Sequence, residues 1–201
     1  LYRAPSPQET ELKELRARRD QVLGILRAES NRIEHARHSA VRKGLKAHIA
    51  ALKKMLAGLE GDTANLISTH DDFARKAELM QTVKGIGPVS AMTLLAEMPE
   101  LGRMTKGEAA RLAGLAPINN DSGQHKGRRH IEPGRVSIRR CLYMAAVVAM
   151  HRNVLIQEFA AQLRARGKPG RVVIAAVMRK LLITLNGILK SGKPWHGAKC
   201  A

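Results

Sequence analysis

The stretch Leu79–Met98, LMQTVKGIGPVSAMTLLAEM, predicts a helix, a tight turn and a second helix. Gly85 and Gly87 flank one apolar residue and permit a sharp backbone turn, because glycine has no Cβ atom. Pro88 suits the first turn of a helix, where its missing N–H group has no intrahelical partner to lose. The pattern is typical of a helix-hairpin-helix, in which free amides at the start of the second helix hold a phosphate group. An ordinary turn between two packed helices can have the same sequence, so both interpretations stay open.

A long helical segment precedes this turn. Ser6-Pro7-Gln8-Glu9 is a capping box, which predicts a helix start. Leucine, isoleucine and valine then follow a heptad seam with three- and four-residue spacing, although Arg19 and Glu29 occupy two of its positions. The apolar seam residues are Leu12, Leu15, Val22, Leu26 and Ile33 and again Leu45, Ile49, Leu52, Leu56 and Leu59. Gly58 and Gly61 are expected to end this segment, with Asp62 or Thr63 capping the next helix. Residues 1–76 are therefore predicted to form a coiled-coil-like arm, paired between protomers, paired within one chain, or packed on the rest of the domain.

The remainder of the chain also predicts helices. Thr105–Glu108 is a second capping box, opening a short helix that ends at Gly114, and helical spacing resumes near Val136. Apolar residues make up 44% of the chain but aromatic residues only 2%, which favours helix-on-helix packing over a strand-rich core. The fold class is predicted to be all-α, with a compact domain over residues 77–193 that contains the helix-hairpin-helix and a long basic loop, and a tail over 194–201.

Charge indicates the kind of partner. The chain has 35 Lys and Arg against 17 Asp and Glu, a formal net charge of +18, which is typical of nucleic-acid-binding proteins. Anionic membranes also attract such a charge, but residues 141–150 are too short to span a bilayer and residues 172–189 are interrupted by Arg179, Lys180 and Asn186. No membrane partner and a cytoplasmic location are therefore predicted. The two cysteines have no zinc-site spacing, and no metal ligand is predicted in this chain.

The segment between Leu115 and Arg135 is predicted to be a long loop that carries the candidate chemistry. Ser122 follows an Asn-Asn-Asp run, and a serine hydroxyl can attack a phosphodiester where cations stabilise the transition state. From composition alone, an ordinary Ser-Gly turn beside phosphate-binding cations is the favoured explanation, because serine is common in loops. The predicted nucleic-acid contacts are Lys84, Gly85, Gly87, Lys126, Arg128, Arg129, Arg135, Arg139 and Arg140.

Several motifs of this region occur in a fixed order: Lys-Gly-Ile-Gly-Pro at 84–88, Gly-Leu-Ala-Pro at 114–117, Ser-Gly at 122–123, and Arg-Cys-Leu-Tyr-Met-Ala-Ala at 140–146. Together with Gly127 and Gly134, they make the chain resemble the C-terminal domain of the insertion-sequence one-ten transposases and the Piv-type invertases. The helical arm is similar to the coiled-coil linker of that family. The resemblance implies that Ser122 is the nucleophile for DNA strand cleavage and exchange, and that duplex DNA and a structured guide RNA, the bridge RNA, are the partners.

In that family a RuvC-like N-terminal domain supplies metal-binding carboxylates. The chain begins at Leu1, directly before the arm, so we expect it to be part of a longer protein. The resemblance implies that magnesium is bound by that other domain, with none bound here, and that this chain alone is inactive. Two alternatives stay open, namely a catalytically inactive nucleic-acid-binding fragment and an oligomerisation module that forms a homo-oligomer through the arm.

Overall fold

A computed structural model describes residues 4–118, 121–122, 125–126, 130–131 and 134–195. It is 78% helical, with eight helices and very little strand, which confirms the predicted all-α class. The chain divides into two compact units, Leu1–Asp71 and Asp72–Ala201. The sequence placed this boundary after residue 76, whereas the structure assigns nearly all of the third helix to the second unit.

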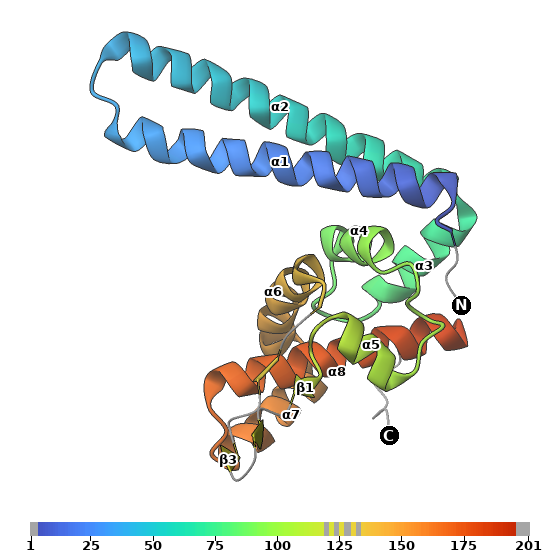
Figure 1. Cartoon of the computed structure of the whole chain (residues 1–201). Coiled ribbons are helices and arrows are strands. Elements are labelled where there is room, and N and C mark those ends of the chain that lie inside the picture. The colour runs from blue at the N-terminus through green and yellow to red at the C-terminus, as the bar shows by residue number, and fades with distance from the viewer. Residues whose placement is uncertain (1–3, 119–120, 123–124, 127–129, 132–133, 196–201) are drawn as a thin grey trace. The chain divides into compact units, whose positions relative to one another are not determined.

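The first unit is a hairpin of two long helices, α1 (Pro7–His35) and α2 (Ser39–Thr69), shown in Figure 1. The capping box is present, with Ser6 Oγ accepting from the Glu9 amide and Glu9 accepting from the Ser6 amide. Arg19 donates to Glu60 at 2.7 Å, and His48 lies 3.6 Å from Glu29, so the helices run antiparallel. Of the arrangements that the sequence left open, the structure has the antiparallel pair within one chain.

The expected helix end at Gly58 and Gly61 is wrong, because α2 continues to Thr69. Each glycine costs about 1 kcal/mol in a helix interior, but packing against α1 along the seam, with Leu52 and Leu66 buried, offsets that cost. Thr63 caps no helix. Its hydroxyl donates back to the Leu59 carbonyl at 2.7 Å, within the same helix.

The second unit begins with α3 (Asp71–Gln81) and α4 (Pro88–Glu97), joined by the tight turn that the sequence predicted. Next comes α5 (Lys106–Leu112), which starts at the predicted capping box of Thr105 and Glu108. The chain ends in α6 (Val136–Arg152), α7 (Val154–Ala165) and α8 (Gly170–Ser191), as Figure 1 shows. Helix α8 contacts α5, α6 and α7 and forms the centre of this core.

The segment between α5 and α6 was predicted to be a loop, and its described residues include short strands. It contains four two-residue strands: β1 (Pro117–Ile118), β2 (Asp121–Ser122), β3 (His125–Lys126) and β4 (His130–Ile131). The outer pair β1 and β4 is antiparallel, with Pro117 opposite Ile131, and the inner pair β2 and β3 is antiparallel, with Ser122 opposite His125. Strands this short produce no alternating apolar pattern, so periodicity could not reveal them.

By length and composition, α8 could cross a membrane, and it is the one such helix in the described part of the chain. Its apolar character has a structural explanation, because Val173, Val177, Leu181, Leu182 and Leu185 are at most 1% exposed within the core of the second unit. Burial on several sides makes a core helix apolar around most of its circumference. The polar residue Asn186, expected to interrupt a membrane span, is buried in the same core.

Asn186 joins α8 to the connection between α4 and α5. Its side-chain oxygen accepts from the Gly102 amide and its side-chain nitrogen donates to the Met104 carbonyl, each at 2.8 Å. We expect Asn186→Leu to lower the free energy of unfolding by about 2–4 kcal/mol, because two backbone groups lose their partner in a buried place. Urea denaturation checks this, with Ser191→Ala at the exposed end of α8 as a control that changes stability little. If Asn186→Leu had the parent's urea midpoint, the two hydrogen bonds of Asn186 would not contribute to stability as described.

Candidate nucleic-acid interface

The two ends of the β1–β4 segment meet at a pair of glycines. Gly134 has a φ of +148°, and a Cβ atom built there would lie 2.3 Å from the Gly114 nitrogen and 2.5 Å from its Cα. The next amide, of Arg135, donates to the Leu112 carbonyl at 3.0 Å. The Leu115 amide donates to the Ala110 carbonyl at 2.7 Å. This neck, formed by residues 112–115 and 134–135, anchors the segment that carries Ser122 to the end of α5.

The side chain of Arg135 strengthens the neck. It donates to both carboxylate oxygens of Glu100, at 2.8 and 2.7 Å, and to the Glu97 carbonyl at 2.6 Å. Hydrogen bonds from Arg135 hold the pKa of Glu100 below its ordinary value, and burial opposes them with a smaller effect. The pair is therefore charged at neutral pH and links the start of α6 to the end of α4. Arg135 was predicted to contact nucleic acid, which stays a prediction, but the structure adds this positioning role.

Helix α6 presents the next predicted cations. Arg139 and Arg140 lie on its first turns; Arg140 is exposed, while Arg139 is half-buried and its Nη1 lies 3.5 Å from the Ala113 carbonyl of the neck. Both residues therefore lie where the Ser122-bearing segment joins the helical core. Lys126 lies in β3, whose backbone pairs with β2, while Arg128 and Arg129 are outside the described residues. The structure thus places Arg135 in the neck, Arg139 against it, and Arg140 exposed on the neighbouring turn of α6.

The predicted phosphate-binding turn lies elsewhere along α6. Gly85 has a φ of +113°, and a Cβ atom there would lie 2.8 Å from Ala149 Cβ and 2.9 Å from the Ala145 carbonyl oxygen. Gly85 is therefore needed for close packing on the second half of α6, whatever it does with phosphate. Gly87 is the N-cap of α4 with open space around it, and Lys84 is exposed. At a rise of about 1.5 Å per residue, roughly 15 Å of helix separates Ala149 from Arg139.

The neck, the paired strands and helices α4, α5 and α6 all lie within residues 77–161. Residues 77–161 match the model of a family described as Transposase IS116/IS110/IS902 family. This stretch is therefore similar to the transposase domain of that family. The match confirms the family resemblance carried by the sequence motifs.

Curated relatives of the transposase domain include the pilin gene-inverting protein of Moraxella bovis, 30% identical over 134 residues, which are 65% of this chain and 42% of the relative. The insertion element IS116 uncharacterized 44.8 kDa protein of Streptomyces clavuligerus is 30% identical over 118 residues, 57% of this chain and 29% of the relative. The insertion element IS900 uncharacterized 42 kDa protein of Mycobacterium paratuberculosis is 26% identical over 193 residues, 92% of this chain and 48% of the relative. The chain thus spans less than half the length of these relatives.

The residues described around the transposase domain do not fit a magnesium site. Asp71 and Asp72 are adjacent on α3, and Asp72 pairs with Lys76. Neighbouring helical residues point in different directions, which is poor geometry for sharing one ion. No group of three or more His, Cys, Asp or Glu side chains gathers anywhere in the described residues. The expectation that magnesium is held by a different domain stays a prediction.

Sequence reasoning missed the residues that support this site. Glu100 lies 35 positions from Arg135, and Asn186 lies more than 80 positions from the loop that it holds. Neither has a local signature, because both act through contacts that exist only after the helices pack. The one signal available was the pair of glycines that bound the segment, Gly114 and Gly134, since glycines at both ends of a loop indicate unusual backbone angles.

Proposed function

We propose that this chain is the C-terminal part of a DNA recombinase, binding duplex DNA and a structured guide RNA and supplying Ser122 as the nucleophile for strand cleavage and exchange. The observation that carries the proposal is the anchoring of the segment that contains Ser122, within the residues that match the transposase family. Ser122 lies in β2, which pairs with β3, and the neck of this segment is packed against the end of α5 where Gly134 meets Gly114. A nucleophile must be held in a reproducible position, and a closed neck limits where the segment can move.

The proposed chemistry is a transesterification. The Ser122 oxygen forms a bond to the scissile phosphorus, and the bond from that phosphorus to one of its two sugar ester oxygens breaks. That oxygen leaves as a hydroxyl with a proton, while the serine proton is lost to the surroundings. The phosphate-bearing end of the same cut strand stays attached to Ser122 as a phosphoserine ester. A DNA hydroxyl can later attack that phosphorus, which rejoins the strand and releases the serine hydroxyl. Lys126, Arg128 and Arg129 are proposed to stabilise charge on the transferring phosphate.

Electrostatics supports a nucleic-acid partner for the second unit. Most of the 35 Lys and Arg residues of the chain belong to this unit, while the first unit has a much smaller excess of positive charge. The exposed cations of the described part include Lys84, Arg103, Lys106, Arg111 and Arg140. Neutralised phosphates release counterions, so binding through such residues is steeply dependent on salt. A cytoplasmic location, where DNA is accessible, belongs to this proposal.

Oligomerisation through the arm is a further part of the proposal. The hairpin of α1 and α2 leaves Ile25, Val41 and Met55 between 41% and 53% exposed. Apolar side chains on an otherwise charged helical surface favour contact with another protein surface. Sedimentation of the chain tests whether a dimer forms.

A binding experiment tests the proposal. The parent chain is titrated with duplex DNA, single-stranded DNA and a structured RNA over a salt series, beside the triple variant Lys126→Ala, Arg128→Ala, Arg129→Ala. We expect the parent to bind tightly and with a strong dependence on salt. For duplex DNA, the slope of log K against log salt should be shallower in the triple variant by about 0.9 for each phosphate contact that it has lost.

A matched control removes the same charge from the arm. Lys43, Lys46 and Lys54 are exposed on α2, and their replacement by alanine changes the net charge equally. We expect this control to bind more tightly than the loop variant. Equal weakening by both variants would mean that only the overall charge matters, which would overturn the placement of the binding surface at the Ser122 segment.

A further inference from the structure

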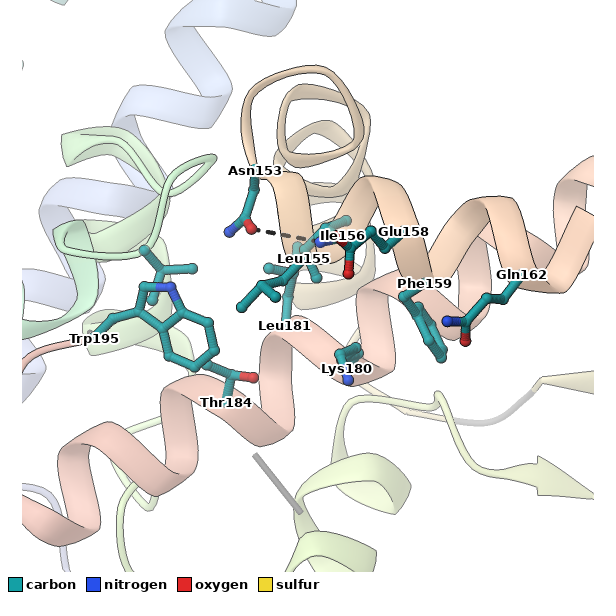
Figure 2. Close-up of a pocket in the computed structure, with 11 residues that line it drawn as sticks. Asn153, Leu155, Ile156, Glu158, Phe159, Gln162, Lys180, Leu181, Thr184 and Trp195 are labelled. Carbon is teal, nitrogen blue, oxygen red and sulfur yellow. Dashed lines mark hydrogen bonds between the residues drawn. The ribbon is translucent and has the colours of Figure 1, made fainter. Parts of the chain in front are cut away.

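The second unit contains a cavity whose described lining residues lie outside the Ser122 segment. It has a volume of about 240 Å³ and lies between α7, α8 and the residues that follow α8, as Figure 2 shows. Leu155 and Ile156 of α7 and Leu181 of α8 form its apolar floor. Two aromatic rings, of Phe159 and Trp195, also line it. The chain has only five aromatic residues, so the presence of two in one cavity is a marked concentration.

The position of Trp195 is defined by the backbone around it. Its amide donates to the Thr82 hydroxyl at 2.9 Å, and that hydroxyl donates to the Leu79 carbonyl at 2.7 Å. The chain turns toward this contact at Gly192, which caps α8 with a left-handed φ of 65°. The indole ring is only partly buried and borders the cavity beside Leu155, Leu181 and Thr184 (Figure 2). Part of an aromatic surface is therefore held next to an open space.

Charged and polar groups surround this aromatic cavity. The ammonium group of Lys180 lies 4.8 Å from the centre of the Phe159 ring, and both side chains line the cavity. Two exposed lysines flank lining residues in the sequence: Lys84 follows Val83, and Lys193 lies two residues before Trp195. Glu158 and Gln162, one helical turn apart on α7, add hydrogen-bonding groups at the other end. The surroundings thus combine an aromatic surface, groups that can bond to a ring edge, and nearby cations.

A nucleotide matches this combination. Its base is a planar ring that stacks on aromatic side chains, its edge has donors and acceptors, and its phosphate is attracted by lysine. In a fully paired duplex each base is stacked between its neighbours, so only an unpaired or extruded nucleotide can enter such a cavity.

We propose that the cavity between α7 and α8 binds one unpaired nucleotide, with Trp195 as the stacking surface and Lys180 beside the phosphate. This inference rests on the proposed function, because it requires that the chain binds nucleic acid. The scarcity of aromatic residues excludes a series of stacked bases but not a single one. Among the described residues, the cavity is lined by none near Ser122, and the variants below leave Ser122 and the cations around it unchanged, so the two sites can be tested separately.

The tryptophan itself supplies the measurement, because Trp195 is the single tryptophan of the chain. Its fluorescence is recorded while the protein is titrated with a DNA hairpin that is closed by a non-nucleotide linker and carries one unpaired thymidine in its stem. The same hairpin fully paired, and the RNA counterpart carrying one unpaired uridine, are titrated beside it. We expect saturable quenching by a hairpin with an unpaired nucleotide and much weaker quenching by the paired one. The stronger quencher of the DNA and RNA hairpins identifies the source of the nucleotide.

Variants then test the stacking role by fluorescence anisotropy of labelled hairpins. We expect Trp195→Leu, which keeps an apolar cover, to weaken binding of the unpaired-nucleotide hairpin about 5- to 100-fold, equivalent to roughly 1–3 kcal/mol. Trp195→Phe keeps an aromatic ring and should lose less. Lys180→Met keeps the aliphatic stem and should also weaken this hairpin. All three should bind the paired hairpin as the parent does, which also shows that they are folded.

The outcomes separate this inference from the proposed function. If the parent binds both hairpins equally and neither quenches Trp195, the nucleotide pocket is overturned while nucleic-acid binding stands. If the parent binds no nucleic acid, both are overturned. Equal binding of the unpaired-nucleotide hairpin by the parent, Trp195→Leu and Lys180→Met would also overturn the pocket.

Discussion

Replacing Gly134 by alanine is expected to lower the free energy of unfolding of the second unit by about 3 kcal/mol or more. The new methyl group would lie 2.3 Å from the Gly114 nitrogen and 2.8 Å from the Ala113 carbonyl carbon, both backbone atoms that no side-chain rotation can move away. The φ of +148° adds strain, because residues with a Cβ atom rarely adopt it. The neck has to open to relieve the clash, which also breaks the bond from the Arg135 amide to Leu112.

Urea denaturation measures the loss, and hydrogen exchange of the Arg135 and Leu115 amides locates it. Gly187→Ala is the matched control, because Gly187 lies within α8 and a methyl group added there would have open space around it, with no neighbouring atom within 4 Å. Alanine there should raise stability by up to about 1 kcal/mol. A Gly134→Ala protein with the parent's midpoint and the parent's exchange rates at both amides would show that the neck is not closed as described.

Ser122→Ala is expected to abolish DNA strand cleavage, with a loss on the order of 10³-fold or more, if Ser122 is the nucleophile. The effect is this large because the covalent intermediate cannot form without the hydroxyl group. DNA binding should be unchanged, since alanine removes no charge. The two results together would distinguish a recombinase part from an inactive nucleic-acid-binding fragment.

The assay combines this chain with the carboxylate domain that the family resemblance implies, because the chain spans less than half of its curated relatives. A denaturing gel then separates free DNA from DNA joined covalently to the protein. The parent and the control Ser68→Ala, an exposed serine of α2, should form the adduct, and Ser122→Ala should not. An adduct of equal yield with Ser122→Ala would assign the nucleophile to another residue.

The helices could be predicted because their signals are local. Both capping boxes, at Ser6 and Thr105, join residues three positions apart, and the turn at Gly85 precedes a proline in the first turn of α4. The same reasoning failed at Gly58 and Gly61, where packing on α1 outweighs the low helix propensity of glycine. Local preference predicts an element well only where tertiary contacts do not oppose it.

The candidate site could be predicted only in part. Ser122 and the basic residues around it stay predictions from composition and resemblance. The strands that contain Ser122 and Lys126 are two residues long and leave no periodic trace. The cavity beside Trp195 was not predicted at all, because its lining comes from the turn after α3, from α7, from α8 and from the chain beyond α8.

The sequence by itself determined the helical class, the basic character of the chain, the helix starts at the two capping boxes and the resemblance to the transposase family, because each depends on composition or on residues close together in the chain. Only the tertiary structure decided that Gly134 lies against Gly114, that Arg135 binds Glu100, and that Gly85 packs on α6. These contacts join residues 20 or more positions apart, and they form only when the burial of apolar helix faces brings distant segments together.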